Sequence, residues 1–460
     1  MLKKNDIFTV EIEDMNFLGF GVAKIDGMAV FVGGAAAGDK AKIKIIKAAK
    51  RYAVARLEEI IVPSVYRVED SCPVSASCGG CAFRAVSYDY EKSLKENFVK
   101  MSFVKQGMHD VCVMPLTYAK LSNYRNKGQY PVRRDASGKT VIGFFAAKSH
   151  RVLDCSDCEL QSAAFAPIIE EIRTFIDEKN ISIYDENSGN GLVRHIYLRI
   201  GESSGEIMLC LVLNGEKLPY EEEFAAFITE KFPAIKSLYI NTNTKNTNVV
   251  LGDRYRLISG KETITDILCG IKLEITPQSF YQVNRDAAEM LYNKAAELAG
   301  FTGDELLLDL YCGIGSIGLS MAHKVKKLIG IEVVASAIEC AKKNAELNGI
   351  ENASFYCGDA ANTEKLLENA KLCEGEFLPD TVILDPPRKG CAKELLDYIS
   401  KLGVQKIVYI SCNSETLARD AKILTEAGYK MGNVYPFDLF SRTGHVECVV
   451  QLCRNEHSSI

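Results

Sequence analysis

The sequence predicts a multidomain α/β protein, in which a small N-terminal β-barrel and a mixed α+β centre precede a Rossmann-like domain. Three observations lead to this fold class. The first 60 residues alternate apolar and polar positions, the chain from residue 277 onward alternates apolar strands with helices, and 460 residues suffice for about three domains of roughly 150 residues each. We therefore divide the chain into residues 1–60, 61–276 and 277–460.

Composition narrows the class of protein further. The chain carries 55 Lys and Arg against 60 Asp and Glu, a formal net charge of −5, which excludes a histone-like cationic binder and leaves any contact with nucleic acid to local patches. No stretch approaches the roughly 20 apolar residues that span a bilayer, so we expect no membrane partner. The N-terminal residues lack the apolar core of a signal peptide, so we expect a cytoplasmic protein whose 16 cysteines stay reduced.

Residues 1–60 predict an OB-like β-barrel. Turn residues separate four runs with period-two patterning: FTVEIE, GVAKIDGMAVFV, GDKAKIKIIKA and YAVARLEEII. Residues 40–56 hold seven Lys or Arg and no acid. A small barrel with a cationic side is a common nucleic-acid-binding design, and the alternative is an ordinary solvated strand face.

The middle of the chain mixes predicted helices and strands. Helical patterns cover residues 88–106 and 161–179, and strand-like runs cover residues 191–200 and 206–213. Residues 124–151 hold seven Lys or Arg and a single acid, and four aromatic residues are interleaved with them: Tyr124, Tyr130, Phe144 and Phe145. Aromatic rings among cations suit single-stranded RNA, whose unstacked bases need π-faces and whose phosphates need positive charge.

A βα rhythm begins at residue 277. Apolar strands are predicted, with helical stretches between them, at residues 305–310, 327–332, 353–356, 381–384 and 405–410. One more strand is predicted at residues 444–452. Apolar strands that alternate with helices predict a parallel, doubly wound sheet that is covered on both faces.

The segment LLLDLYCGIGSIGLSMA carries the strongest local motif. An apolar strand ends at Asp309, and Gly313, Gly315 and Gly318 then open a helix with the pattern G-x-G-x-x-G. Glycine lets the backbone approach a ligand closely, which makes Gly313 a candidate cofactor contact. Glu332 stands 19 residues after Gly313, where its carboxylate can accept both hydroxyls of a ribose. The motif predicts an adenosine-containing cofactor and leaves NAD and S-adenosylmethionine both open.

Two later strand ends add chemistry to the same edge of the sheet. The motif DPPR, which begins at Asp385, follows the fourth strand, and Cys412 follows the fifth strand just before a predicted helix over residues 414–426. A helix N-terminus lowers the pKa of a thiol, so Cys412 is a candidate nucleophile. Glu447 is the odd charge in the apolar final strand, and the alternative for it is an edge-strand carboxylate that faces water.

Four segments together resemble the RNA (uracil-5-)methyltransferases that carry a TRAM domain: DLYCGIGSIGL, DPPRKG, SCNSETLARD and HVECVV. The resemblance covers nearly the whole chain and implies that the N-terminal barrel is a TRAM domain and that S-adenosylmethionine is the cofactor. It implies that Cys412 is the nucleophile and Glu447 the general base. It places further cofactor contacts on Gln282, Tyr311, Glu332, Asp359 and Asp385.

Three cysteines lie within ten residues of one another at Cys72, Cys78 and Cys81, and Cys155 or Cys158 can supply a fourth thiol. Four thiolates suit either zinc or an iron–sulfur cluster, and the spacing does not choose between them. The resemblance implies a [4Fe-4S] cluster with Cys158 as the fourth ligand. By analogy it also favours ribosomal RNA, because the branch of the family that acts on transfer RNA lacks the cluster.

Methylation of uracil carbon 5 in RNA, with 23S ribosomal RNA as the expected substrate, is therefore the leading functional hypothesis. Transfer RNA is the alternative substrate. Two hypotheses of other classes stay open: an NAD-linked iron–sulfur oxidoreductase, which leaves DPPR and the SCN segment unexplained, and a non-catalytic RNA-binding assembly factor. No feature of the sequence predicts an obligate protein partner.

Overall fold

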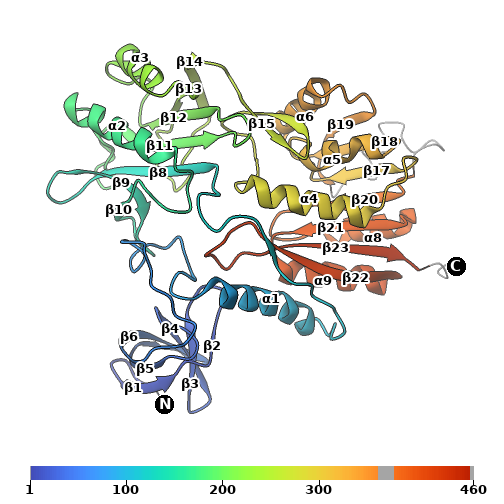
Figure 1. Ribbon diagram of the computed structural model, residues 1–460, viewed down its shortest axis with the longest axis horizontal. Coiled ribbons are helices and arrows are strands. Elements are labelled where there is room, and N and C mark those ends of the chain that lie inside the picture. The colour runs from blue at the N-terminus through green and yellow to red at the C-terminus, as the bar shows by residue number, and fades with distance from the viewer. Residues whose placement is uncertain (1, 361–377, 456–460) are drawn as a thin grey trace.

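A computed structural model describes residues 2–360 and 378–455 of the chain, and these residues build three main β-sheets (Figure 1). The N-terminal sheet has six strands, the central sheet seven and the C-terminal sheet eight. In Figure 1 the N-terminal sheet lies beside helix α1 (Tyr88–Lys105), and the other two sheets lie on the far side of that helix. None of the described helices is long and apolar enough to cross a membrane.

The N-terminal barrel contains strands β1 (Ile7–Glu11), β2 (Asp14–Met15), β3 (Gly21–Ile25), β4 (Met28–Gly33), β5 (Lys40–Ala48) and β6 (Tyr52–Val62), in the order β1-β5-β6-β4-β3-β2. The alternation predicted from the sequence is confirmed on β5, because Ala41, Ile43 and Ile45 are buried in the core while Lys40 and Lys42 face outward. The cations of residues 40–56 therefore lie on a strand face that the core does not use.

The central sheet runs in the order β10-β9-β8-β11-β12-β13-β14. Its strands are β8 (Lys127–Arg134), β9 (Thr140–Phe145), β10 (Val152–Asp154), β11 (Val193–Ile200), β12 (Ile207–Leu213), β13 (Ile235–Thr242) and β14 (Arg254–Gly260). Helices α2 (Phe165–Glu178) and α3 (Glu221–Lys231) pack on it through a shared apolar core. The strands predicted at residues 191–200 and 206–213 are confirmed as β11 and β12.

The basic segment of residues 124–151 forms two of these strands. Tyr124 and Tyr130 are buried, so the expectation that they offer π-faces to RNA is wrong. Tyr130 belongs to the apolar core beneath α2, and the hydroxyl of Tyr124 donates a hydrogen bond to the carbonyl oxygen of Ser441 at 3.0 Å. The alternation of Tyr130 with cations reflects the two faces of β8, one toward the core and one toward polar partners.

The C-terminal sheet confirms the predicted βα rhythm. Its order is β19-β18-β17-β20-β21-β23-β22-β7, in which β17 to β21 are parallel and β23 runs antiparallel to β21. The strands are β7 (Thr117–Tyr118), β17 (Leu306–Leu310), β18 (Lys327–Glu332), β19 (Ala353–Cys357), β20 (Thr381–Leu384), β21 (Lys406–Ser411), β22 (Tyr429–Asp438) and β23 (Glu447–Arg454). Strand β22 has no counterpart in our prediction, because Gly432, Asn433 and Pro436 interrupt its apolar pattern.

Helices cover both faces of this sheet, as expected for a doubly wound fold. One core contains residues of α4 (Arg285–Ala299), α5 (Ser316–Met321) and α6 (Ala335–Leu347), and the opposite core contains residues of α1, α8 (Lys393–Leu402) and α9 (Ser414–Glu426). A short 3-10 helix, η1 (Ala322–Lys324), follows α5, and a hairpin of β15 (Ile264–Leu268) and β16 (Ile271–Ile275) precedes α4.

Two elements of the middle segment pack on the C-terminal sheet. Helix α1 contributes Val99 and Phe103 to the core under α8 and α9, and β7 pairs with the end of β22. Both fall in residues 61–276, the range that we assigned to the central domain. The three domain ranges stay a prediction. The structure adds that the middle range supplies α1, which packs on the C-terminal sheet, and β7, which pairs with that sheet.

Candidate functional site

The groups that the sequence singles out follow one another along a single edge of the C-terminal sheet. Because β17 to β21 are parallel, their carboxyl ends meet at that edge. In strand order the edge carries Asp359 after β19, Glu332 at the end of β18, Tyr311 after β17, Asp385 after β20 and Cys412 after β21. Glu447 begins the antiparallel β23 and therefore joins the same row.

The loop after β17 leaves open space where a ligand can approach. Tyr311 has φ of +65°, an unusual value for a residue with a side chain, and Gly313 has φ of +55°. No atom lies within 4 Å of where a Cβ on Gly313 would sit. The N–H of Gly313 donates to Glu332 Oε2 at 3.3 Å, and the N–H of Val334 donates to Glu332 Oε1 at 3.0 Å. The predicted ribose acceptor is thus held beside the glycine loop.

Asp309 lies beneath this loop and is fully buried. Its Oδ2 accepts a hydrogen bond from the N–H of Gly318 at 2.9 Å, while its Oδ1 has no partner among the described residues. Burial raises the pKa of Asp309 to about 8. An unpartnered buried oxygen beneath an open glycine loop and beside Glu332 fits a polar ligand such as the adenosine part of S-adenosylmethionine.

The remaining predicted cofactor residues approach the same edge from other elements. Gln282 precedes α4, whose first turn is capped by Asn284, and the carbonyl oxygen of Gln282 accepts a hydrogen bond from Asn126 at 2.8 Å. The hydroxyl of Tyr292 on α4 lies 3.2 Å from Ser316 Oγ at the start of α5. Asp359 is exposed just after β19.

Strand pairing brings Cys412 and Glu447 to the same end of neighbouring strands. Ser411 on β21 pairs with Cys448 on β23, Cys412 directly follows Ser411, and Glu447 directly precedes Cys448. The two side chains are close enough for Glu447 to raise the pKa of Cys412. Cys412 is half-buried, and only 6% of Glu447 is exposed to solvent. The alternative that Glu447 faces water from an edge strand is therefore wrong, because β22 covers that side of β23.

The two loops that flank the candidate nucleophile are bound to each other. Asn413 caps α9 by accepting N–H groups of its first turn, and its amide donates to the carbonyl oxygen of Arg388 at 3.2 Å. The rest of the DPPR loop is held by Asp420, which accepts the N–H of Cys391 at 2.8 Å and the hydroxyl of Tyr409 at 2.6 Å. The positions of Asp385 and Cys412 are thereby coupled.

The electrostatics of the site differ from our expectation. Burial, together with Glu447 and Asp385, raises the pKa of Cys412 to about 11, and Arg388 acts in the opposite direction. The expectation that the N-terminus of α9 lowers this pKa is therefore wrong for the ligand-free protein. Burial and Asp385 raise the pKa of Glu447 to about 8, and burial raises that of Asp385 to about 7. Asp385, Cys412 and Glu447 therefore cannot all be ionised at once at neutral pH.

A buried charge network that sequence reasoning missed supports the loop before Glu447. Lys95 Nζ on α1 lies 2.7 Å from Glu91 Oε1 and 2.9 Å from Asp438 Oδ2, and all three side chains are fully buried. The N–H of Arg442 in the loop donates to Glu91 Oε1 at 2.7 Å. In the sequence, Glu91 and Lys95 have the spacing of an ordinary solvated i,i+4 pair. Only the packing of α1 against β22 buries this pair together with Asp438.

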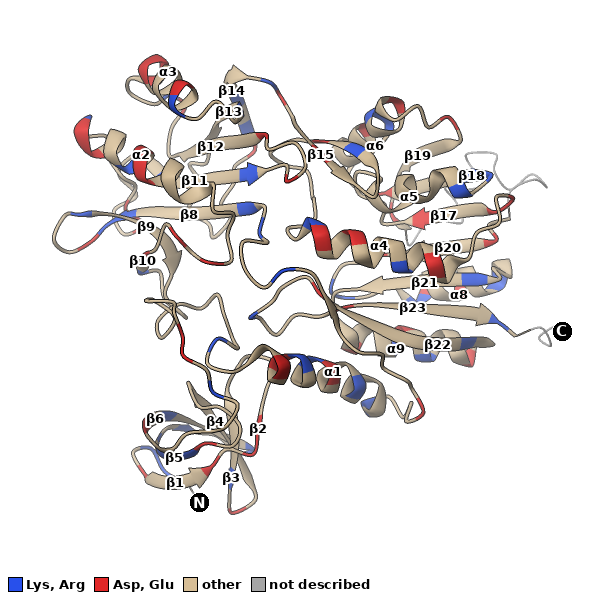
Figure 2. Cartoon of the chain, in the orientation of Figure 1, with Lys and Arg blue, Asp and Glu red and all other residues tan. Residues whose placement is uncertain are grey.

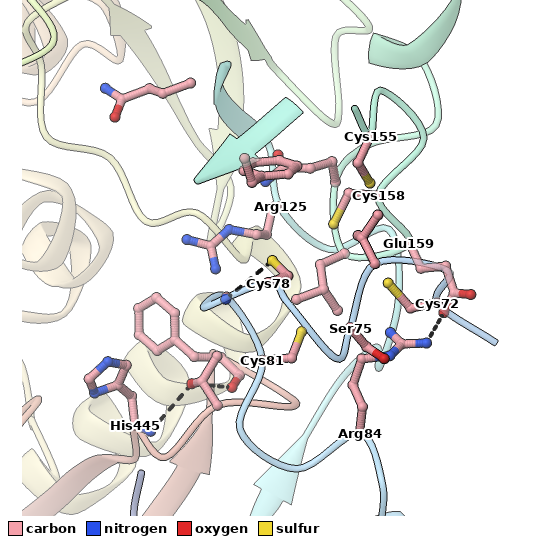
Figure 3. Close-up of a pocket in the computed structure, with 18 of the residues that line it drawn as sticks. Cys72, Ser75, Cys78, Cys81, Arg84, Arg125, Cys155, Cys158, Glu159 and His445 are labelled. Carbon is pink, nitrogen blue, oxygen red and sulfur yellow. Dashed lines mark hydrogen bonds and ion pairs between the residues drawn. The ribbon is translucent and has the colours of Figure 1, made fainter. Parts of the chain in front are cut away.

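The clustered cysteines line one cavity of about 440 Å³. Figure 3 shows sulfur atoms of Cys72, Cys78, Cys81 and Cys158 turned toward a common space, with Cys155 at its margin. The N–H of Gly80 donates to Cys78 Sγ at 3.4 Å. Burial raises the pKa of Cys158, and the N–H groups of Leu160 and Gln161 act in the opposite direction. Cys155 is buried against β9, where its N–H donates to the carbonyl oxygen of Ile142 at 3.0 Å.

This cavity is not the compact ligand set of a single metal ion. Within residues 2–360 and 378–455, no three Cys, His, Asp or Glu side chains form a group close enough to hold one ion. A four-iron cluster is larger than one ion and takes one thiolate on each iron, so it needs ligands that surround a wider space. Four of the thiols line one shared cavity, and four thiolates are the ligand set that either zinc or a four-iron cluster takes.

Four basic side chains also line the cavity: Arg84, Arg125, Lys127 and Arg388. Arg84 is neutralised by Asp70 and Glu159, and burial lowers the pKa of Lys127 to about 8. Elsewhere, Arg133 pairs with Glu186 and Arg134 pairs with Asp177. Figure 2 shows Lys and Arg on β5 and β6 of the barrel, on α1 and at the ends of β8. Of the seven basic residues between 124 and 151, two therefore line the cavity and three are held in ion pairs.

Comparisons with known proteins agree with this architecture. The family model of tRNA (uracil-5-)-methyltransferases matches residues 244–455, and that of the TRAM domain matches residues 2–57. Relatives named uncharacterized RNA methyltransferase include one from Clostridium tetani, 41% identical over 98% of this chain and 96% of the relative. Another, from Bacillus cereus, is 40% identical over 99% of this chain and 98% of the relative.

A solved structure resembles the whole chain. It is the crystal structure of the Pyrococcus abyssi tRNA (uracil-54, C5)-methyltransferase in complex with S-adenosyl-L-homocysteine. It matches with a TM-score of 0.76 and 27% sequence identity, covering 97% of this chain and 100% of that chain. The similarity extends from the N-terminal barrel through the central sheet to the sheet that carries the row of strand-end groups.

Proposed function

This chain belongs to the tRNA (uracil-5-)-methyltransferase family of RNA methyltransferases, and from that premise we propose that it methylates uridine in 23S ribosomal RNA through a covalent adduct with Cys412. It is an S-adenosylmethionine-dependent RNA (uracil-5-)methyltransferase. The NAD-linked oxidoreductase and the non-catalytic assembly factor, which the sequence left open, are therefore set aside. The single observation that carries the proposed mechanism is the strand pairing that brings Cys412 and Glu447 to neighbouring strand ends, where Asp385 raises the pKa of both.

The proposed mechanism starts from the weak nucleophilicity of uracil carbon 5. The Cys412 thiolate adds to carbon 6 and forms an S–C bond, and the displaced electron pair moves onto the ring oxygen as an enolate. Carbon 5 becomes nucleophilic in this adduct and accepts the methyl group. Glu447 then removes the proton from carbon 5, the double bond between carbons 5 and 6 re-forms, and Cys412 leaves as a thiolate.

Charge at the strand ends sets the conditions for these steps. Glu447 acts as a base only when it is ionised, and its pKa of about 8 keeps much of it protonated at neutral pH. Arg388 is the neighbouring cation that favours ionisation of both Cys412 and Glu447. We therefore expect the rate to rise as the pH increases from about 7 to 9.

S-Adenosylmethionine, when bound, supplies the methyl group as an electrophile on a sulfonium. We propose that the glycine loop at Gly313 approaches the cofactor, Glu332 accepts its ribose hydroxyls, and Tyr311, Gln282, Asp359 and Asp385 complete its surroundings. The open backbone at Gly313 and the hydrogen bond from its N–H to Glu332 support this assignment. In the row, Asp385 lies between the glycine loop, where we place the cofactor, and Cys412, where we place the attack on uracil.

We further propose that Cys72, Cys78, Cys81 and Cys158 hold a [4Fe-4S] cluster. Support comes from their shared cavity, from the N–H donors directed at the sulfurs of Cys78 and Cys158, and from Arg125 and Arg388, which line the same cavity and favour an anionic cluster. Such a cluster would bind the loop of residues 72–81 to the loop that contains Cys158. The cluster would have a structural or a redox role, and the methyl transfer described above does not involve the cluster.

Two substrates have support of different kinds. The thiol pattern favours ribosomal RNA by analogy with the branch of the family that carries a cluster. The similarity over the full chain to a transfer RNA (uracil-54, C5)-methyltransferase favours transfer RNA as the second candidate. In either RNA the target base must leave its stack to reach Cys412.

The decisive experiment supplies both RNAs side by side. Unmodified 23S ribosomal RNA and unmodified transfer RNA are each incubated with the enzyme and S-adenosylmethionine labelled in the methyl group, and digested nucleosides are analysed for 5-methyluridine. We expect label in ribosomal RNA alone and none with Cys412→Ala, whereas Cys453→Ala, a thiol far along β23, should behave like wild type. Label in transfer RNA alone would move the assignment to the second candidate, and label in neither would overturn the proposed function.

A further inference from the structure

A rigid loop of the N-terminal barrel presents two apolar side chains to solvent beside the candidate nucleophile. Between β2 and β3, Asn16 Oδ1 accepts the N–H groups of Leu18 and Phe20, each at 3.0 Å, and the carbonyl oxygen of Asn16 accepts the N–H of Gly19 at 2.9 Å. These bonds fix the turn. Phe17 and Leu18 nevertheless remain 58% exposed each.

The backbone of this loop lies tightly against two other segments. A Cβ on Gly444, in the loop that leads to Glu447, would overlap the carbonyl oxygen of Phe17. A Cβ on Gly19 would overlap the carbonyl oxygen of Ala82, which follows the last cysteine of the 72–81 loop. The barrel therefore contacts the catalytic domain through backbone atoms, and the Phe17 ring is not needed to make that contact.

Phe17 also lines a cavity of about 320 Å³ that reaches Cys412. Phe98 and Met101 of α1 line the same cavity, as do Asn413 and Arg388. Among the described residues that line it, neither Asp385 nor Glu447 is present. The cavity is thus a separate space next to the place where the target uracil must lie.

We propose that this cavity is a subsite for the nucleotide next to the target uridine, whose base stacks on Phe17. The inference rests on the proposed function. A base that rotates into an enzyme site leaves its neighbour without a stacking partner. An exposed aromatic ring on a rigid loop can replace that partner for any base, because every base has a π-face. Arg388, which is exposed and lines the cavity, lies where a connecting phosphate would pass.

An unpaired nucleotide fits this surface better than a protein segment does. Aromatic and aliphatic side chains line the cavity together with Arg388 and the ion pair of Lys105 with Glu415, and the position beside Cys412 is the one that substrate must reach. A protein bound there would block the nucleophile. The barrel therefore contributes a specific contact at the reaction centre in addition to the general charge of its outer face.

The test uses a hairpin RNA with one uridine in its loop and 2-aminopurine, a fluorescent adenine analogue that stacking quenches, on the 5′ or the 3′ side of that uridine. With wild type we expect quenching for one of the two positions. Phe17→Ala should abolish that quenching and raise the KM for RNA roughly tenfold or more, with kcat at saturating RNA unchanged. Phe17→Trp should restore both, and Leu18→Ala, the equally exposed neighbour, should resemble wild type.

The outcomes separate this proposal from the proposed function. Quenching and KM that are the same in Phe17→Ala and wild type would overturn the subsite, even if methylation proceeds normally. Quenching without methyl transfer by wild type would retain the subsite and remove the proposed reaction on this RNA. A fall in thermal midpoint and kcat in Phe17→Ala with quenching intact would mean a structural role, and a wild-type dimer that this variant dissociates would mean a second copy as the occupant; either result overturns the subsite.

Discussion

The row of strand-end groups and the thiol-lined cavity are built in opposite ways. Each group in the row follows or begins a strand of one sheet, so the hydrogen-bond ladder fixes its position to within a residue. The thiols stand on loops, and ion pairs hold those loops together: Arg84 joins Asp70 at 2.7 Å and Glu159 at 2.8 Å. The sheet thus positions the groups of the row. The loops around the cavity are positioned by local polar contacts and by any group that the thiols bind.

Removing the nucleophile is the strongest test of the row. Cys412→Ala should lower methyl transfer by about a thousandfold or more, because loss of a nucleophile is not compensated by the surrounding groups. The thermal midpoint should barely change, since Cys412 is half-buried after its strand has ended. Single-turnover methyl transfer and calorimetry measure the two effects. Retention of a tenth of the activity would show that the row does not act through this thiol.

Glu447→Gln should lower the rate by about 10²- to 10⁴-fold and leave a protein–RNA adduct that survives denaturing gels, because no base removes the proton from carbon 5. It should also stabilise the ligand-free protein. The pKa of Glu447 is raised to about 8, so the folded state resists ionisation, and wild-type stability falls as the pH rises from about 5 to 8.

The difference in thermal midpoint between Glu447→Gln and wild type should therefore be positive and should grow from pH 6 to pH 9. Calorimetry at both pH values measures it. A difference that does not vary with pH would mean that Glu447 is ionised freely in the folded protein. Glu447 would then lie in the row without the raised pKa that burial and Asp385 impose on it.

The buried network tests whether the row depends on α1 as well as on its own sheet. Lys95→Met leaves Glu91 and Asp438 buried without their cation, which should cost about 3 to 5 kcal/mol and lower the thermal midpoint by roughly 6 to 20 °C. Adding Glu91→Gln should recover part of that loss. Lys92→Met, which breaks the pair with the exposed Asp89 and a cation–π contact with Tyr118, should cost about 1 kcal/mol. Equal effects of the two lysine substitutions would contradict the network.

The cavity should respond to its own substitutions with the smallest effect on the chemistry. Cys158→Ser should lower bound iron and visible absorption in anaerobically purified protein, whereas Cys155→Ser, the matched control three residues away, should retain both. The kcat of Cys158→Ser for methyl transfer should stay near the wild-type value, because the sheet holds the row independently. Iron loss from Cys155→Ser alone would reverse the ligand assignment, and zinc in place of iron in wild type would remove the cluster.

How far the sequence predicts each region follows from the same contrast. Gly313, Asp385 and Cys412 were predictable because apolar strand patterns show where strands end, and parallel strands end at one edge. The strand pairing that brings Cys412 and Glu447 to neighbouring strand ends, the burial of Tyr130 and the pairing of Lys95 with Asp438 all depend on long-range packing, which local periodicity does not encode. For the same reason the sequence predicted the wrong direction for the pKa of Cys412, since the helix N-terminus is local and the opposing carboxylates are not.

The contact between the Phe17 loop and Gly444 has a consequence for how the enzyme is made. The barrel emerges from the ribosome before the surface on which its loop rests, which is synthesised about 430 residues later. At roughly 5 to 20 residues per second, the barrel waits on the order of 20 to 90 s for that surface. The contact beside Cys412 therefore cannot form until Gly444 has been translated, and a nascent chain cannot close the site around RNA before then.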